Sequence, residues 1–454
     1  MNKSLLIMTL SSFTALMIAS PLRADNSIKL GDAVQKALQN NHQLKAMEYE
    51  AEATQTDIGL ARSGFMPQLN LTQTFQRTNN SPQSFFFKLN ERQLDMQNTD
   101  FNNPGTNTDF ETKLQLVQPL YTGGKLSASL EMAKKEHQAS LRQVDRTADE
   151  ISYQAAQAWY NLKVAMKFKE VAIMAVKDAT SHYRIAQAFF EEGKGTKSDM
   201  LRARVFLSEM EQNQVKASTQ VRIAGRALAL ALGESPDGEL SAEGDLVYLP
   251  VSVNMEESIN EGLVSRSELK ELSLRQDQID LQRQVAHADY LPSIALVGQV
   301  QMNSENTPLK DDADSWYGGL VITYPLFDGF ARDYKMKKTQ ASKRRLLELK
   351  EQTSQYVSFQ ISQAVLKLED ASKRVELTRN TVAESEESLR LTELRYQNGL
   401  STLTDLNDAQ TALNQSRVNE IQAIAEYHLA LIGLDYSKGI LASKYSSVKN
   451  NEPK

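Results

Sequence analysis

The spacing of apolar and polar residues changes its period at Pro67. Residues 30–64 place apolar side chains at every third or fourth position, which predicts a helix with one buried face. After the proline, Leu69, Leu71 and Phe75 alternate with polar residues, as they would in a strand with one apolar face. The chain therefore begins with a helix followed by a strand.

The same order of patterns occurs twice. Residues 28–69 align without a gap with residues 253–294, so that Pro67 meets Pro292. The strands pair into β-hairpins expected over 67–119 and over 292–325. Because 52 positions separate the bounding prolines of the first hairpin and 33 separate those of the second, the first copy carries 19 extra residues. The chain is predicted to be a tandem repeat of one unit.

The longest segments free of glycine and proline predict two very long helices. They cover residues 125–192 and 330–398, and a helix of about 68 residues would run roughly 100 Å. Their apolar residues, many of them alanines, step by three or four, as in closely packed coiled coils. Gly193 and Gly399 follow as helix ends, and return helices are expected to about 232 and 432. Each copy thus holds one β-hairpin and one long helical hairpin.

These patterns, with those at the two ends of the chain, predict how the whole chain is divided into segments. Lys3, the apolar stretch behind it and Ala24 predict a cleaved signal peptide. Segments 234–254 and 434–454 lack clear periodicity and are expected to be irregular. The expected divisions are a signal peptide (1–24), a first repeat with its tip near 193 (25–233), a linker forming an equatorial segment (234–254), a second repeat with its tip near 399 (255–440) and a C-terminal tail (441–454).

Composition removes several classes of function. The chain has no cysteine, which excludes disulfides, thiolate metal sites and an N-terminal lipidated cysteine. Its formal net charge is −6 without a basic stripe, so nucleic acid is not expected as a partner. The five histidines are scattered along predicted helices, and no nucleophile motif or phosphate loop occurs. We therefore expect no catalysis, no cofactor and no metal site.

The number of strands in one chain limits how many copies are needed to close a barrel. An exported chain with alternating strands suggests an outer-membrane barrel, because only closed sheets and helices span a bilayer. Four strands are too few to close, whereas two copies give eight with a filled interior and three give twelve with a lumen. A trimer is the smallest assembly that leaves a channel.

Six short motifs resemble those of the TolC-like family of outer-membrane efflux and secretion ducts, and the resemblance covers nearly all of the mature chain. They occur as three pairs, one member in each repeat. The motifs are Phe65-Met66-Pro67 and Tyr290-Leu291-Pro292 at the helix-to-strand junctions, Gln118-Pro119-Leu120-Tyr121 and Tyr324-Pro325-Leu326-Phe327-Asp328-Gly329 at the strand-to-helix junctions, and residues 193–199 and 399–405 at the helix tips.

The resemblance implies a mainly α fold with a small membrane β part. In that fold a homotrimer joins a twelve-stranded barrel in the outer membrane, in contact with its lipid, to a twelve-helix periplasmic barrel. It also implies a periplasmic adaptor at the tips and an inner-membrane pump of RND, ABC or MFS type. The duct would be a passive conduit for drugs, toxic compounds or secreted proteins, and the sequence leaves the cargo open.

Asp405 and Asp408 are the candidate entrance residues. Thr402-x-x-Asp405 and Thr196-x-x-Asp199 fit helix capping boxes, which is a structural role. The resemblance adds that Asp405 and Asp408 line the periplasmic entrance, where six carboxylates from three subunits would attract cations. Both interpretations are open.

Tyr396 is a candidate latch that holds the entrance shut. The resemblance implies that it bonds to the neighbouring hairpin, with Asp199 as its partner. The alternative is a tyrosine half-buried between helices. Ser401 stands where the family often has an arginine, which puts a second latch bond in doubt.

The tip turns have two interpretations that are compatible. Gly193, Thr196, Gly399, Leu400 and Thr402 form the ends of helices, and by resemblance they also dock the adaptor.

Two further questions remain open at the level of sequence. Phe85-Phe86-Phe87, in the extra loop, could fold over the outer mouth, touch lipid headgroups or form a local cluster. The rival function is a soluble periplasmic coiled-coil protein such as the adaptor itself, which should carry one helical hairpin rather than two.

Overall fold

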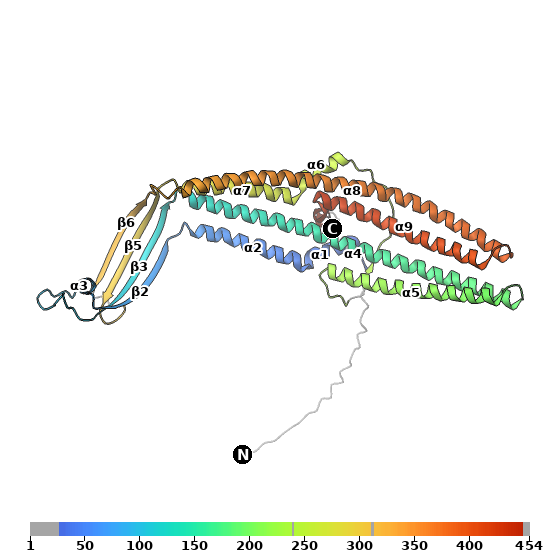
Figure 1. Cartoon of the computed structure of the whole chain (residues 1–454), viewed down its shortest axis with the longest axis horizontal. Coiled ribbons are helices and arrows are strands. Elements are labelled where there is room, and N and C mark those ends of the chain that lie inside the picture. Colours follow the sequence, from blue (N-terminus) through green and yellow to red (C-terminus); the bar gives the residue numbers. More distant parts are fainter. Residues whose placement is uncertain (1–26, 238–239, 310–312, 448–454) are drawn as a thin grey trace, which may run out of the picture. The chain divides into compact units, whose positions relative to one another are not determined.

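The computed structural model describes residues 27–237, 240–309 and 313–447. The expected signal peptide (1–24) and the last part of the expected tail (448–454) lie outside these residues. The elements in chain order (Figure 1) are β1 (Ser27–Ile28), α1 (Leu30–Asn40), α2 (His42–Ser63), β2 (Gln68–Thr78), α3 (Ser81–Asn90), β3 (Asn107–Tyr121), α4 (Lys125–Glu191), α5 (Lys197–Ala231), β4 (Ser241–Ala242), α6 (Met255–Ser265), α7 (Ser267–Ala288), β5 (Ser293–Ser304), β6 (Asp314–Thr323), α8 (Ala331–Gln397), α9 (Leu403–Lys438) and α10 (Leu441–Ser447).

The tandem repeat predicted from the sequence is confirmed. Two short helices, a β-hairpin and a long helical hairpin follow one another in each copy. Both long helices, α4 and α8, have 67 residues. Among the described residues, no helix combines the length and the hydropathy that a membrane crossing requires.

The chain divides into two compact units, to which α4, α8 and α9 each contribute. The sheet unit comprises the described residues within 34–154, 248–379 and 426–454. The tip unit comprises those within 1–33, 155–247 and 380–425.

A four-stranded antiparallel sheet characterises the sheet unit. Its order is β2-β3-β5-β6, so that the two hairpins pair through β3 and β5. Figure 1 shows the strands side by side, with α3 near the strand ends remote from α2 and α7. The predicted hairpins are confirmed, and the 19 extra residues add an unexpected helix, α3.

The single helix expected over 30–64 is wrong in one detail, because it breaks at Asn41. The side-chain oxygen of Asn41 accepts from the N–H groups of Gln43 (2.8 Å) and Leu44 (3.3 Å), which starts α2 afresh. An asparagine that caps the following turn competes with helix continuation. The second copy also breaks, between α6 and α7 at Arg266, although there the side chain makes no capping hydrogen bond.

The expected irregularity of 234–254 and 434–454 is also partly wrong. In the tip unit, β4 pairs in parallel with β1, and Trp159 donates its indole N–H to the Ile28 carbonyl oxygen at 2.8 Å. In the sheet unit, α9 continues to Lys438, and α10 follows Gly439. The carboxylate of Asp149 accepts from the N–H of Ala442 at 2.8 Å, so a partner distant in sequence starts α10.

Asp149 makes the stability of the sheet unit depend on pH. Burial raises the pKa of its carboxyl to about 6. Because the folded state holds this proton more tightly than the unfolded state, stability present below about pH 4 is lost as the pH rises through 6. Asp149→Asn keeps an acceptor for Ala442 without the charge, and should stabilise the protein by roughly 1–2 kcal/mol at pH 8 but little at pH 4.

Thermal unfolding in detergent at pH 4 and pH 8 measures this difference. Glu131→Gln is the matched control, because Glu131 lies on the same helix in a solvent-exposed pair with Lys134 and is not one of the charges that act on Asp149. An equal pH dependence in wild type and Asp149→Asn would contradict the assignment.

Candidate entrance at the helix tips

The first tip turn joins α4 to α5. Gly193 adopts a φ of 70°, a left-handed conformation that favours glycine, and the N–H of Lys194 returns to the Phe189 carbonyl oxygen at 2.8 Å. Thr196 caps α5, since its hydroxyl oxygen accepts from the N–H of Asp199 at 3.1 Å and its hydroxyl donates to the Asp199 carboxylate at 2.6 Å. The predicted cap by Thr196 is confirmed, and Asp199 bonds the Thr196 hydroxyl rather than its backbone N–H.

The second tip turn joins α8 to α9 with the same geometry. Gly399 has a φ of 72°, and the exposed Leu400 follows it (69% exposed). One carboxylate oxygen of Asp405 accepts from the N–H of Thr402 (2.8 Å) and from the hydroxyls of Thr402 (2.8 Å) and Ser401 (2.9 Å). Ser401 therefore serves the cap of α9.

These donors favour the ionised form of the Asp405 carboxyl. The N–H of Thr402, followed by the two hydroxyls, lowers the pKa of the Asp405 carboxyl below its ordinary value. Asp408 lies three positions further on, also exposed, and residues three apart share one side of a helix. The first two turns of α9 therefore present two carboxylates to the surroundings of a single chain.

Tyr396 belongs to an apolar cluster that joins all four helices of the tip unit. The cluster consists of Ala186, Ala203, Leu389, Tyr396, Leu403, Leu406 and Leu413. The ring of Tyr396 lies 5.7 Å from that of Phe189, and 8% of the residue is exposed. Burial, with a further contribution from the Asp199 charge, raises the pKa of the Tyr396 hydroxyl.

The structure of one chain thus places Asp199 close enough to Tyr396 to affect its hydroxyl electrostatically. In the part of the chain that the structure describes, Asp199 is hydrogen-bonded to Thr196 rather than to this hydroxyl. The predicted latch between neighbouring hairpins stays a prediction.

Polar contacts between the two hairpins were missed by the sequence analysis. His182 on α4, almost fully buried, lies 3.2 Å (Nε2) from the carboxylate of Glu393 on α8. Gln410 on α9, with no exposed surface, donates to Asp178 on α4 at 3.4 Å. Helical periodicity shows that such residues face inward but not which distant helix they meet, so no signal in the sequence pairs them.

Two copies of a β-hairpin and a helical hairpin in one chain, with an apolar sheet face and two exposed carboxylates at the second helix tip, define the tandem-repeat class of outer-membrane ducts. The chain belongs to the outer membrane efflux protein family, whose sequence profile matches residues 33–234 and 258–439. It is an exit duct of the cell outer membrane, from a family of channels rather than enzymes.

Individual relatives are distant but extensive. The proteases secretion protein PrtF of Dickeya chrysanthemi is 22% identical over 90% of this chain and 88% of its own length. The cobalt-zinc-cadmium resistance protein CzcC of Cupriavidus metallidurans is 21% identical over 71% of this chain and 75% of its own. The solved structure of the CmeC outer membrane channel of Campylobacter jejuni shares the fold at a TM-score of 0.76 and 17% identity, covering 93% of this chain and 89% of that one.

Proposed function

We propose that three copies of the chain form one duct, with a twelve-stranded barrel in the outer membrane and a twelve-helix tunnel in the periplasm. The sheet carries this proposal, because it has four strands and an apolar face exposed in one chain. Four strands leave two unpaired edges, and three copies remove all six by closing on one another. The same closure gathers the three copies of each tip.

The gathered tips form the periplasmic entrance. Asp405 and Asp408 of three subunits make a ring of six carboxylates, while Tyr396 and Asp199 take part in holding it shut. The ring acts on cargo through its charge and its width, as charged constrictions do in other channels.

The cargo is supplied by a periplasmic adaptor and an inner-membrane pump. The names of the relatives span secreted proteases and metal resistance, so both proteins and small toxic solutes are candidate cargoes. A deletion strain screened for drug and metal susceptibility and for loss of secreted proteins distinguishes them. The rival function, a soluble adaptor, predicts release without detergent when cells are fractionated.

Adaptor docking can be tested at Leu400, which is exposed beside Gly399. Because the chain has no cysteine, Leu400→Cys introduces a single thiol. We expect this thiol to crosslink to a co-expressed adaptor through a short bifunctional reagent, as detected by the mass of the product. Met96→Cys, exposed in the loop beyond α3, is the matched control and should give none. Equal yields at the two positions would contradict docking at the tips.

A further inference from the structure

The two faces of the sheet differ sharply in chemistry. Strand register places Leu71 opposite Leu114 and Leu296 opposite Leu320 on one face. The other face carries polar pairs, which are Glu111 with Asn303, Lys113 with Gln301, and Gln115 with Gln299. In an outer-membrane barrel the apolar face meets lipid and the polar face lines the lumen.

The helix α3 covers one end of the polar face. Asp109 lies two residues before Glu111 and therefore on the same face, and it is 4% exposed. Its carboxylate accepts two contacts, 2.9 and 3.1 Å long, from the side-chain nitrogen of Asn303. The helix supplies the cover, because α3 contacts β3 and buries Ser84, Phe87 and the adjoining Glu91 along one side.

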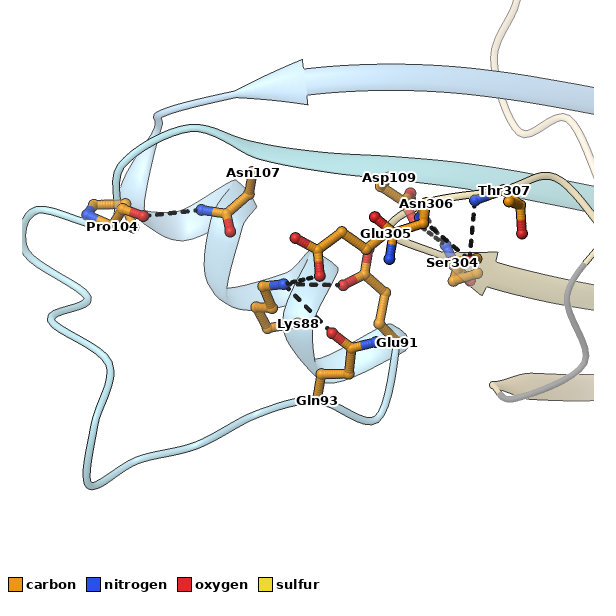
Figure 2. A network of polar contacts seen from close by, with 11 residues as sticks. Lys88, Glu91, Gln93, Pro104, Asn107, Asp109, Ser304, Glu305, Asn306 and Thr307 are labelled. Carbon is orange, nitrogen blue, oxygen red and sulfur yellow. Dashed lines mark hydrogen bonds and ion pairs between the residues drawn. The ribbon is translucent and has the colours of Figure 1, made fainter.

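A polar clasp, defined as Lys88, Glu91, Arg92, Glu305 and Asp314, fastens the end of α3 to the residue after β5 and to the first residue of β6. Lys88 donates to Glu305 at 2.8 Å and lies 3.5 Å from Glu91, as Figure 2 shows. Arg92 donates to the backbone oxygen (2.6 Å) and carboxylate (3.2 Å) of Asp314. Because these partners come from the second repeat, the clasp ties the extra loop of the first repeat to the other β-hairpin.

Glu91 is the weak member of this clasp. It is 3% exposed, and within the described parts of the chain neither of its carboxylate oxygens is well hydrogen-bonded, the Lys88 ammonium being 3.5 Å away. Burial, with the nearby charges of Asp109 and Glu305, raises the pKa of Glu91 to about 7, against the lowering effect of Lys88. A buried carboxylate with so little hydrogen bonding is costly when ionised.

The opposite side of α3 is apolar and exposed. Pro82, Phe86 and Leu89 are spaced by four and three, so they form one stripe, in which Phe86 is 58% and Leu89 46% exposed. Since the buried side rests on the polar face of the sheet, this stripe is directed away from the wall of the barrel. The neighbouring Phe85 packs on Phe101 at 5.3 Å and holds the rest of the loop to the helix.

The size of the barrel decides what the stripe meets. Twelve strands about 4.8 Å apart and tilted by about 40° close to a radius of roughly 12 Å. One helix with its side chains is about 10 Å across. Three such helices on the inner side of the wall leave almost no open bore at that end.

We propose that residues 79–106 are an outer lid, in which the stripes of three α3 helices meet and close the outer mouth of the duct. This proposal rests on the trimeric channel proposed above. The stripe of one α3 packs against the corresponding stripes of the other two copies. It does not pack against lipid, because it is apolar but lies on the lumen side of the wall.

The clasp makes the lid responsive to pH. The groups that face Glu91 are Lys88 on α3, Asp109 on β3 and Glu305 beyond β5. The closed lid holds the Glu91 proton more tightly than a detached lid does, so closure is favoured below about pH 4.5 and weakens as the pH rises through 7. Alkaline surroundings thus loosen the lid, and acid tightens it.

The cysteine-free chain allows a direct test of the meeting point. In the purified trimer, oxidation of Phe86→Cys should yield disulfide-linked subunits, whereas Met96→Cys, exposed in the same loop, should yield few. Absence of linked subunits from Phe86→Cys, and also from Leu89→Cys, would overturn the contact between copies.

Access to the lumen tests closure. Gln115→Cys places a thiol on the polar face below the lid, and intact cells are labelled with a membrane-impermeant maleimide at pH 6 and pH 8. Rates are divided by those of the external Met96→Cys to remove the reactivity of the thiolate itself. Adding Lys88→Gln, which leaves the clasp carboxylates without their lysine, should raise the normalised rate roughly tenfold. Adding Glu91→Gln should remove the increase between pH 6 and pH 8.

Deletion of residues 82–104 separates this proposal from the proposed function. Labelling of Gln115→Cys that is fast only after deletion supports the lid. Equally fast labelling before and after deletion overturns the lid and leaves the channel intact. No labelling even after deletion means that the polar face does not line an open lumen, which overturns the proposed channel as well.

Discussion

Replacing Asp405 and Asp408 together by asparagine should abolish most of the block that multivalent cations exert on current through the duct. In the proposed trimer these residues contribute six carboxylates at one constriction, where like charges crowd together and attract counter-ions. We expect the apparent dissociation constant of a divalent or trivalent cation added on the periplasmic side to rise at least roughly tenfold, equivalent to ~1.4 kcal/mol. Single-channel recording in planar bilayers measures it.

The geometry supplies a control that separates charge from capping. Thr402→Ala removes the hydroxyl that accepts from the Asp405 N–H and donates to its carboxylate, and it leaves both charges in place. Block should survive in Thr402→Ala. A loss of block in this variant as large as in the double aspartate variant would show that the shape of the tip, rather than the ring of charge, carries the effect.

The lowered pKa of Asp405 adds a pH dependence with a defined sign. A carboxyl with a lowered pKa remains ionised at a pH where an ordinary aspartate, with a pKa of about 3.9, has taken up its proton. The pH at which the Asp408→Asn variant, which retains Asp405, loses half of its cation block should therefore lie below about 3.9, the value that an ordinary aspartate would give. Block that disappears between pH 6 and pH 5 would contradict the role of the three donors.

Much of the architecture follows from local patterns. The change of period at Pro67 and the absence of breakers in 125–192 are properties of neighbouring residues, and the structure confirms the strand and the helix that they predict. The tip caps are equally local, since Thr196 and Asp199 lie within one turn of each other. Such features need no knowledge of the rest of the fold.

Other features depend on partners far apart in the chain, and these escaped prediction. Asp149 starts α10 from a position on α4, and His182 meets Glu393 across two hairpins. The helix α3 was missed because ten residues give only a short periodic signal, although Asn80 and Pro82 form a local start signal. Its cover for Asp109 becomes visible only in the folded chain. The proposed entrance ring is even harder to predict from one sequence, because it requires carboxylates from three copies of the chain.

Residues that align between the two repeats can have different surroundings, as one pair of glycines shows. Gly123 and Gly329 align between β-hairpin and long helix, and both adopt left-handed φ values, 64° and 67°. Their surroundings differ. A side chain at Gly123 would meet the backbone oxygen of Ala288 at 2.9 Å and the side chain of Leu291 at 3.0 Å, whereas no described residue comes within 4 Å of one at Gly329.

Gly123→Ala should therefore destabilise the duct far more than Gly329→Ala. Both variants carry the left-handed penalty of about 1–2 kcal/mol, but only Gly123→Ala adds overlap with backbone, which brings the expected loss to about 3–5 kcal/mol. The midpoint of thermal unfolding in detergent, together with the yield of assembled protein in the outer membrane, measures the difference. If the two alanine variants lost equal stability, the left-handed conformation alone would explain the need for glycine at position 123, and the predicted overlap with Ala288 would be contradicted. A larger loss at Gly123 means that the junction of the first repeat is held by close approach to the end of α7, a contact that ties the two copies of the repeat together at the base of the sheet.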